Sequence, residues 1–482
     1  MHKIMLLYPP GEVYQRGEDR CQMNVSASVA NSLRACNDLG YISAILKQKG
    51  NWKIFLKDYS GENLTKNQFR NDFKTQNPDV VVISTTTGSI FRDIDFVNQI
   101  KSLKNDVVII LKSALFFNFD KKLYNKLNLE NVDYLIGGEV EFIIDKLLSA
   151  HLENKQNLEK IEGISYKINN EWITNPVSHF EENLDAIPFP DRDLMNNEIY
   201  KNPLTNKPMA TIATSRGCSA QCIYCLSPII SGVKVRFRSP QSVVDEMLEC
   251  VEKYRISDFF FKSDTFTINK EWVIKLCDLI IDSPLYGKIN WVANSRTNTV
   301  DDDILSKMKQ AGCSLIAFGL ESGSEDSLLK MKKGTTVELN RQAINLAKKH
   351  GIKTFGFYLI GFPWETKKHL NDTKDFMFEA NTDFIEIHLL VPYEGCELFK
   401  MLENKGKSFN LLGEDNCKYH TNGTDYLSSE EIEAFKRSVT LKYYLRPKYI
   451  AKKIFSAEIT PSLLLNYIKY GLRMCKNFLL PQ

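Results

Sequence analysis

The sequence predicts an α/β protein with an N-terminal doubly wound parallel sheet, then a partial parallel barrel of six strand–helix units, and a helical C-terminal extension. Short apolar runs rich in Val and Ile alternate with segments of helical spacing over about the first 150 residues. Such strands, separated by helices, indicate a parallel sheet covered on both faces. A second alternating series starts at about residue 209 and supplies the barrel, whose active site would lie at the C-terminal strand ends.

These elements divide the chain into a first domain over residues 1–152, a connector over 153–205, the barrel over 206–400 and an extension over 401–482. The N-terminal strands are expected at 3–8, 52–56, 79–84, 106–111 and 133–136, with helices at about 29–49 and 141–151. The barrel strands are expected at 210–214, 258–262, 289–293, 315–319, 354–360 and 384–391. Barrel helices are expected at 241–254, 270–281, 302–311 and 337–350. The connector holds a small predicted hairpin at 163–168 and 172–174.

Composition and charge exclude several classes of protein. The 482 residues include 62 Lys and Arg against 59 Asp and Glu, so a net charge of +3 gives no overall field for a polyanion, and no nucleic-acid partner is expected. With 43% hydrophobic residues, the chain has enough apolar material for real cores. No stretch approaches 18 uncharged apolar residues, and MHKIMLLYPP is interpreted as a buried strand rather than a secretory signal. We therefore expect a cytoplasmic protein.

The eleven cysteines divide into two groups. An odd number spread thinly along the chain does not indicate a disulfide framework. Eight are interpreted as small buried hydrophobic residues: Cys21, Cys36, Cys250, Cys277, Cys313, Cys396, Cys417 and Cys475. The other three, Cys218, Cys222 and Cys225, lie in the segment CSAQCIYC directly after the first barrel strand.

Three thiolates in one loop can reach a common metal centre. Zinc normally takes four protein ligands in a structural site, or three and a water in a catalytic site. No His or fourth Cys lies close in sequence to complete a structural zinc set. A [4Fe–4S] cluster with three protein thiolates instead leaves one iron open to a substrate or cofactor.

The CxxxCxxC spacing, with the aromatic Tyr224 before the last cysteine, resembles the signature of the radical S-adenosylmethionine (SAM) superfamily. The resemblance implies a [4Fe–4S] cluster on Cys218, Cys222 and Cys225, whose open iron binds the amino and carboxylate groups of SAM. It further implies that one electron cleaves SAM to a 5′-deoxyadenosyl radical, with Tyr224 near the adenine.

Five further segments resemble the radical SAM subfamily that has an N-terminal cobalamin-binding domain, which contains the bacteriochlorophyll ring cyclase and methylases of hopanoids and natural products. They are DAIPFPDR at 185–192, FKSDTFT at 261–267, WVANSR at 291–296, FGLESGS at 318–324 and GFPWET at 361–366. The resemblance implies a set of SAM-binding residues: Tyr224, Asp264, Arg296, Gly319, Glu321 and Gly361.

The resemblance implies physical roles for five of these residues. Glu321 would bind the ribose hydroxyls and Arg296 the carboxylate of SAM. Gly319 and Gly361 would let the backbone approach the nucleoside. Asp264 would contact the methionine amino group or the substrate, although a capping or solvated role stays open for Asp264 and Arg296. No residue is assigned as a catalytic acid or base.

The first domain resembles a Rossmann-like cobalamin-binding domain through its helix LGYISAILKQKG at 39–50, its hydroxyl-rich loop after the third strand and its GGEVE turn at 137–141. The cobalamin-binding residues implied are Asp58, Ser84, Thr85, Thr86, Gly137, Gly138 and Glu139. One feature departs from the pattern: the segment LKSALFFN at 111–118 lacks the usual Gly-Gly-x-His. No Asp-x-His-x-x-Gly offers an imidazole to cobalt, but this is common in the subfamily, whose resemblance implies a corrinoid bound without a histidine ligand. A domain that kept the fold and lost the ligand is the alternative.

Two segments lie outside these motifs. The long polar loop after the first strand contains RGEDRCQ at 16–22, which would face the substrate, with Cys21 as a reactive thiol being the less favoured interpretation. Beyond about Phe435 the tail has ten Lys and Arg against one Glu, interleaved with aromatic residues such as Tyr443 and Tyr444. Such a helical tail lies on an anionic membrane surface, meets an acidic partner, or packs on the barrel with a solvated basic face, and the last is favoured.

The leading hypothesis is a cobalamin-dependent radical SAM methylase that acts on an unactivated carbon of a small-molecule or lipid substrate. An electron donor such as flavodoxin or ferredoxin would be its partner. A radical oxidation, cyclisation or rearrangement without methyl transfer is the second hypothesis. A non-catalytic iron–sulfur or corrinoid sensor is the third, and the SAM-like strand ends at Glu321 and Gly361 argue against it.

Overall fold

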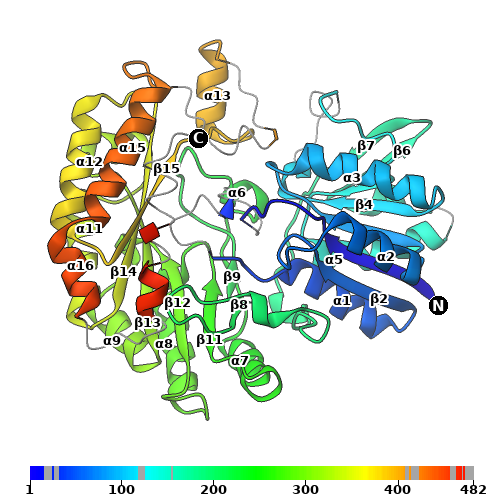
Figure 1. Ribbon diagram of the computed structural model, residues 1–482, viewed down its shortest axis with the longest axis horizontal. Helices are drawn as coiled ribbons and strands as arrows, with labels where there is room; N and C mark the ends of the chain where they lie inside the picture. Colours follow the sequence, from blue (N-terminus) through cyan, green and yellow to red (C-terminus); the bar gives the residue numbers. More distant parts are fainter. Residues whose placement is uncertain are drawn as a thin grey trace.

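The structure is a computed structural model that describes residues 1–15, 24–25, 32–117, 125–153, 156–407, 412–413, 423–455, 463–468 and 471–472. Two α/β bodies lie side by side, with the N-terminal sheet at the right and the barrel at the left of Figure 1. Their parallel sheets confirm the predicted fold class. Several residues singled out in the sequence lie outside the described residues: the segment 16–22 with Cys21, and Cys417, Lys469, Arg473, Cys475 and Lys476.

The N-terminal sheet has seven strands in the order β2-β1-β3-β4-β5-β6-β7. They are β1 (His2–Tyr8), β2 (Trp52–Asp58), β3 (Val80–Ser84), β4 (Val108–Lys112), β5 (Tyr134–Ile136), β6 (Ile164–Ile168) and β7 (Glu171–Asn175). The first five run parallel, as predicted, whereas β6 and β7 form an antiparallel hairpin that pairs with β5. The hairpin predicted in the connector is therefore part of this sheet.

Helices cover both faces of the N-terminal sheet, which makes it doubly wound. On one face, α1 (Asn37–Lys49) and α5 (Val140–Leu152) pack against Leu6 and Val82. On the other face lie α2 (Lys66–Gln76) and α3 (Ile90–Leu103), and neither was among the predicted helices. The polar sequence of α2 buries just two side chains, so its signal is a capping box at its start rather than an apolar face.

Helix α1 begins at Asn37, later than the predicted start at about residue 29. Residues 32–36 are not helical. The Arg34 guanidinium lies 3.7 Å from the ring centroid of Phe260, and Asn37 Nδ2 donates to the carbonyl of Thr211 at 2.7 Å. These contacts with the barrel hold the segment away from helical geometry, so tertiary contacts override the local pattern.

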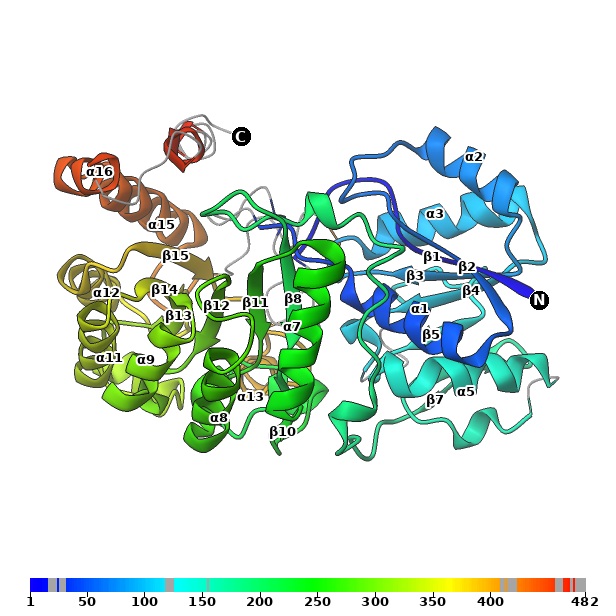
Figure 2. The same ribbon diagram turned by 90° about the horizontal axis from the view of Figure 1, so that it is seen from below.

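The barrel consists of six parallel strands in the order β15-β14-β13-β12-β11-β8. They are β8 (Met209–Ala213), β11 (Asp258–Lys262), β12 (Asn290–Ser295), β13 (Cys313–Glu321), β14 (Lys353–Ile360) and β15 (Phe384–Leu389). Figure 2 shows the helices on the outside: α7 (Pro240–Tyr254), α8 (Lys270–Ile281), α9 (Asp302–Gln310), α11 (Val337–Lys349) and α12 (Lys367–Ala380). All six predicted strands and the four predicted helices are confirmed, with small shifts of their ends.

Alternate residues of each barrel strand face two different cores. On β13, Ile316 and Phe318 pack outward under the helices, whereas Leu315 and Ala317 pack inward with Phe355. The inner face of the barrel is therefore apolar around these residues. Five of the cysteines interpreted as packing residues are buried: Cys36, Cys250, Cys277, Cys313 and Cys396.

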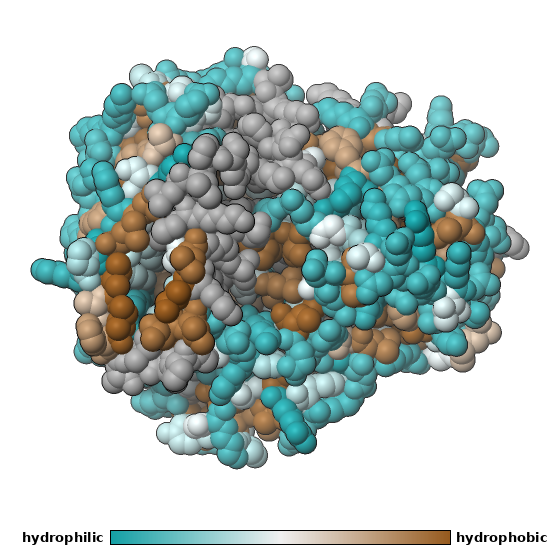
Figure 3. Space-filling view, in the orientation of Figure 1, coloured by the Kyte–Doolittle hydropathy of each residue, from teal (hydrophilic) through white to brown (hydrophobic). Residues whose placement is uncertain are grey.

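The C-terminal helices are α13 (Glu397–Asn404), α15 (Ser429–Tyr444) and α16 (Pro447–Ile454). Of these, α15 and α16 cover the open edge of β15. The Tyr444 hydroxyl accepts from Ile385 N at 2.8 Å and donates to Ile385 O at 2.6 Å, while Tyr449 donates to Asp383 O at 2.7 Å. An exposed strand edge is a site for unwanted pairing, and these hydroxyls occupy it. Figure 3 shows hydrophobic side chains on the outer side of this region.

Replacing Tyr444 by Phe should lower the free energy of unfolding by about 1–3 kcal/mol, because the amide and carbonyl of Ile385 would lose the hydroxyl that pairs them. Urea denaturation at equilibrium measures this change. Tyr426→Phe is the matched control, since this ring is 66% exposed and its replacement should leave stability unchanged. An unchanged free energy in the Tyr444 variant would contradict the role of the hydroxyl at the edge.

Candidate functional site

The three clustered cysteines lie in a loop that follows β8 at the C-terminal end of the barrel. A short antiparallel ribbon of β9 (Ser215–Arg216) and β10 (Arg236–Phe237) holds the two ends of this loop, and α6 (Ser227–Ile230) lies within it. Gly217 has φ +93°, and a Cβ there would lie 2.2 Å from the carbonyl of Lys234. Because just glycine satisfies both constraints, this position fixes how the chain enters the cysteine loop.

The thiols of the loop are half-buried and face hydrogen-bond donors. Arg296 Nη1 lies 3.5 Å from Cys222 Sγ, and the amide of Ser227 donates to Cys225 Sγ at 3.4 Å. Burial opposes the charge of Arg296, but the neighbouring Cys222 and Cys218 sulfurs raise the pKa of this guanidinium overall. A cation and an amide beside thiols favour the thiolate form.

Sulfur donors in this setting fit an iron–sulfur cluster, because thiolates are the usual ligands of such clusters. Among the residues that the structure describes, no three His, Cys, Asp or Glu side chains are placed to hold one metal ion. The binding of a cluster by Cys218, Cys222 and Cys225 stays a prediction.

Tyr224 packs into a small apolar cluster beneath the cysteine loop. Its ring lies 5.6 Å from that of Phe362 in an edge-to-face arrangement, and burial raises the pKa of its hydroxyl well above the usual value. The neighbouring Ile223 donates its amide to Met331 O at 3.1 Å and accepts from Leu398 N, at the start of α13, at 2.8 Å. Both α13 and the segment after α10 (Glu325–Lys330) therefore support the loop from below.

Glu321, at the end of β13, belongs to a network that reaches the cysteine loop. Its φ of +63° coincides with a register shift between β13 and β14. Glu321 Oε1 lies 2.7 Å from Lys333 Nζ, and the carbonyl of Lys333 accepts from Arg296 Nη2. A Cβ on Gly319 would lie 2.6 Å from Glu321 Oε1 and 2.9 Å from Lys333 Nζ, so a side chain at this position would displace the ion pair. The structure thus brings together three predicted residues, Arg296, Gly319 and Glu321, through Lys333.

Lys333 is a site residue that sequence reasoning missed. It is 6% exposed and precedes Gly334 in the segment after α10. A lysine in a Lys-Lys-Gly turn is typical of a solvated surface, so the sequence alone gives no signal that this ammonium is buried against a carboxylate.

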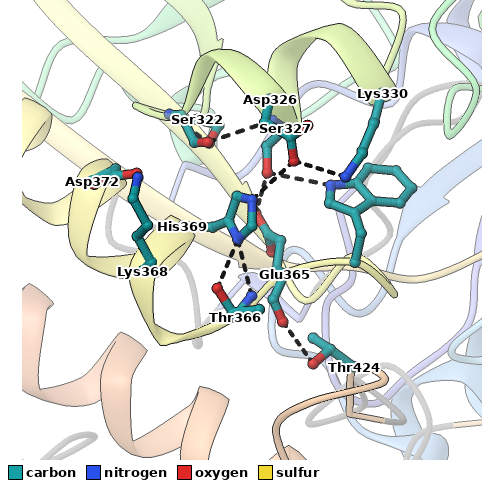
Figure 4. Close-up of polar contacts among 12 residues, drawn as sticks. Ser322, Asp326, Ser327, Lys330, Glu365, Thr366, Lys368, His369, Asp372 and Thr424 are labelled. Carbon is teal, nitrogen blue, oxygen red and sulfur yellow. Dashed lines mark hydrogen bonds and ion pairs between the residues drawn. The ribbon is translucent and has the colours of Figure 1, made fainter.

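Asp264 and Gly361 lie at two other strand ends. Asp264, after β11, accepts from Ser227 Oγ at 3.1 Å and so links this strand to α6 of the cysteine loop. Gly361, after β14, has φ +103° and donates its amide to the buried Glu365 carboxylate at 2.7 Å. Figure 4 shows Glu365 between Ser327, which donates to its carboxyl group at 3.3 Å, and Thr424, which donates to its carbonyl at 2.8 Å.

Burial raises the pKa of Glu365 to about 7, against the lowering effect of the amides of Gly361 and Phe362. Sequence reasoning noted the acid of the GFPWET turn but assigned it no role. In the structure this carboxyl group holds the turn that contains Gly361.

The carboxyl edge of the N-terminal sheet carries a polar cluster that sequence reasoning missed except for Ser84. Asp38 Oδ2 accepts from Ser84 Oγ at 2.6 Å and from Tyr8 Oη at 3.0 Å, and it lies 3.1 Å from Lys112 Nζ. Burial raises the pKa of Asp38, but Lys112 and the hydroxyls lower it overall. Tyr8, Ser84 and Lys112 each end a parallel strand, and this shared position was the available signal.

The other predicted hydroxyls of this edge pair within the protein. Thr85 Oγ1 donates to Asp93 Oδ2 at 2.6 Å, and Thr86 Oγ1 lies 2.9 Å from Ser89 Oγ. All four side chains are buried. Their contacts shape the loop between β3 and α3, and binding of cobalamin by Thr85 and Thr86 stays a prediction.

Asp58 and the two glycines of the GGEVE turn also have structural contacts. Asp58 accepts from Gly61 N at 2.8 Å and from Tyr200 Oη, in the connector, at 2.9 Å. A Cβ on Gly137 would lie 2.2 Å from the carbonyl of Phe116, and Gly138 lies against Gly163 of the hairpin. Glycine is therefore required at 137 by packing, whatever the ligand.

Glu139 and Glu141 connect the two domains. Arg236 forms a two-pronged pair with Glu139 at 2.8 and 3.0 Å, and Arg216 lies 2.6 Å from Glu141 and 3.1 Å from Glu139. All four side chains are at most 12% exposed. Because the glutamates follow β5 and Arg216 precedes the cysteine loop, the carboxyl edge of the first sheet faces that loop.

Comparison with known proteins agrees with this geometry. Residues 212–377 match the model of the radical SAM superfamily. The chain is 30% identical over 458 residues to a protein of Pyrococcus horikoshii named as an uncharacterized methyltransferase. The alignment covers 94% of this chain and 95% of that protein. It is 26% identical over 380 residues to the anaerobic magnesium-protoporphyrin IX monomethyl ester cyclase of Rubrivivax gelatinosus, which covers 77% of this chain and 67% of the cyclase.

The chain therefore belongs to the radical SAM superfamily and is a radical SAM enzyme, whose family cofactors are a [4Fe–4S] cluster and SAM. Its fold is that of TsrM, a radical S-adenosylmethionine methyltransferase from Kitasatospora setae whose structure holds cobalamin and a [4Fe-4S] cluster. The TM-score is 0.72 at 15% identity, with 99% of both chains covered. Both domains thus share this architecture.

Replacing Glu365 by Gln should remove a pH dependence of stability. Folding raises the pKa of Glu365 from 4.5 to about 7, so the folded state binds the proton more tightly. The stability from this proton is complete below pH 4.5 and is lost as the pH rises through about 7, a change of about 3 kcal/mol. Urea denaturation between pH 4.5 and 8 measures the free energy of unfolding of both proteins. The difference between the two pH curves reports Glu365, because the other titrating groups contribute equally to both proteins. Parallel curves would contradict the raised pKa.

Replacing Glu321 by Gln should weaken SAM binding about 10-fold or more, because the variant loses a charged acceptor for the ribose hydroxyls. Equilibrium dialysis of radiolabelled SAM against the anaerobic, cluster-loaded enzyme measures the affinity. Glu338→Gln on α11, 58% exposed at its side chain, is the control and should bind SAM as the wild type does. Equal affinities in all three proteins would remove Glu321 from the SAM site.

Proposed function

We propose that this enzyme is a cobalamin-dependent radical SAM methylase that methylates an unactivated carbon of a small molecule. The observation that carries the proposal is the pairing of Glu139 and Glu141 with Arg216 and Arg236. It sets the carboxyl edge of the N-terminal sheet against the cysteine loop. Since ligands of parallel sheets bind at this edge, a corrinoid on the first domain and SAM in the barrel would share one space.

The barrel residues supply the SAM half of the proposed site. Cys218, Cys222 and Cys225 would hold the cluster, which when bound supplies the electron that cleaves SAM. Arg296, beside Cys222, offers a guanidinium to the carboxylate of SAM. Glu321, oriented by Lys333, offers acceptors to the ribose hydroxyls.

The edge of the first sheet fits a corrinoid by its chemistry. The amide side chains of a corrin need both donors and acceptors, and the cluster of Tyr8, Asp38, Ser84 and Lys112 presents both. A bound corrinoid would supply the methyl carrier. Lys112, and not a histidine, ends β4, which agrees with a cobalt that takes no protein imidazole.

The inner face of the barrel supports a small organic substrate. Phe355 and Phe357 line it with Leu315, and Arg34 of the first domain reaches Phe260 on the same face. The substrate would therefore lie between apolar rings and the inward side of the first domain. The electron donor, flavodoxin or ferredoxin, remains an expectation from the chemistry.

A second candidate function is a radical oxidation or cyclisation without methyl transfer. The similarity to the cyclase of Rubrivivax gelatinosus favours it. A non-catalytic sensor is disfavoured, because it has no need of the buried network of Glu321, Lys333 and Arg296.

The enzyme, loaded anaerobically with iron, sulfide and hydroxocobalamin and reduced chemically, should convert SAM to both 5′-deoxyadenosine and S-adenosylhomocysteine. Liquid chromatography measures both products, and the corrinoid spectrum after desalting measures its retention. 5′-Deoxyadenosine without S-adenosylhomocysteine would support the cyclisation candidate and contradict the methylase.

A matched pair of variants separates the two cofactors in this experiment. Replacing Cys218, Cys222 and Cys225 together by Ala should abolish bound iron and deoxyadenosine while the corrinoid is retained. Cys277→Ala, buried under the barrel helices, should keep all three. Wild-type protein that retains no corrinoid would overturn the proposal and leave the radical SAM assignment intact.

A further inference from the structure

The C-terminal helices have one face against the barrel and another in solvent. Tyr443, Tyr444 and Tyr449 point inward and donate hydrogen bonds to carbonyls around the start of β15. The aliphatic and phenyl side chains of the same segment point outward. Leu445, Ile450, Ile454 and Phe455 are 47%, 40%, 42% and 84% exposed.

A second short helix at residues 463–468 repeats this pattern. Leu465 and Ile468 of this helix are 57% and 49% exposed, and their spacing of three places them on one helical face, while the nearby Leu472 is 67% exposed. Figures 1 and 2 show this helix near α16 on the same side of the molecule, and Figure 3 shows hydrophobic side chains gathered there. We define the C-terminal apolar surface by seven residues: Leu445, Ile450, Ile454, Phe455, Leu465, Ile468 and Leu472.

The segment that carries most of this surface is basic. Residues 434–457 contain seven Lys and Arg and no Asp or Glu. Several of these cations contact other groups of the protein: Arg446 stacks 4.0 Å over the ring of Tyr443, and Lys453 and Lys452 lie 3.3 and 3.8 Å from Asp383. Lys448 and Lys452 are exposed beside the apolar residues of α16.

We propose that the C-terminal apolar surface docks the enzyme on an anionic membrane surface, with α16 lying in the plane of the headgroups. Apolar side chains flanked by lysines on a short helix are what such binding requires. An anionic lipid surface complements both properties, whereas a second copy of the chain would bring like charges together. Of the described helices, none is long and apolar enough to cross a bilayer, so the contact would be peripheral.

This inference is independent of the proposed methylase activity, because it rests on the outer side of α16 and not on the site. It also combines the packing and the membrane interpretations of the basic tail. The tyrosines pack against the barrel, as the first interpretation predicts. The outward residues of the same helices are exposed and are available for the membrane contact that the second predicts.

Flotation of the full-length protein with vesicles tests the proposal. The protein should float with vesicles of phosphatidylcholine containing phosphatidylglycerol and remain unbound with phosphatidylcholine alone. Lys448→Ala with Lys452→Ala should weaken the partition coefficient about 30-fold. Ile454→Glu with Phe455→Glu should weaken it at least about 10-fold, because two exposed apolar groups are lost.

Matched controls have the same changes elsewhere on the surface. Leu329→Glu with Tyr286→Glu replaces two side chains that are 78% and 55% exposed on the barrel, and Lys53→Ala with Lys66→Ala removes two charges from the first domain. Both should bind vesicles as the wild type does.

Three outcomes would overturn the proposal. The first is no flotation with either vesicle. The second is binding that the lysine variant loses but the Ile454 and Phe455 variant keeps, which would indicate a soluble polyanion instead of a bilayer. The third is a dimer in light scattering that the Ile454 and Phe455 variant dissociates, which would indicate a second copy on this surface.

Discussion

Four buried charges, two from each domain, decide how the halves of this enzyme meet. Glu139 and Glu141 approach Arg216 and Arg236 at hydrogen-bond distance and with little exposure to water. Parting them would leave charges unpaired in a place from which water is largely excluded, which is costly. The alternative of rotating one domain is therefore unfavourable, and the polar ends of two parallel sheets are held facing each other. The cysteine loop, the Glu321 network and the Asp38 cluster become parts of one site because of this pairing.

The connector also attaches the two domains to each other. Asp191 lies 2.6 Å from Lys47 and accepts from Ser43 on α1, while the adjacent Arg192 lies 2.6 Å from the buried Glu246 on α7. Two consecutive residues thus attach the connector to a helix of each domain. The DAIPFPDR segment, which resembles a family motif, has here a mechanical role that explains its acid and base without any cofactor.

Local patterns in the sequence predicted most of the framework, because each barrel strand is a short apolar run and each helix that was predicted has an amphipathic spacing, which the polar α2 lacks. The cysteine loop could also be predicted, because its three cysteines lie within eight residues of the sequence. What the sequence could not reveal depends on contacts between distant segments. Lys333 is a charged residue that is buried in an ion pair with Glu321. Helix α1 begins later than predicted because Arg34 and Asn37 contact the barrel. The hairpin of β6 and β7 joins the first sheet only by pairing with β5.

The contact of Arg34 with Phe260 has a consequence for how the chain is made. Domains generally fold as they leave the ribosome, N-terminal first. The first sheet is complete once β7 has emerged, but the segment before α1 has its partner on β11, which is synthesised much later. The contact between Arg34 and Phe260 therefore forms only after the first sheet is complete, so the residues before α1 take their final position late in the synthesis of the chain.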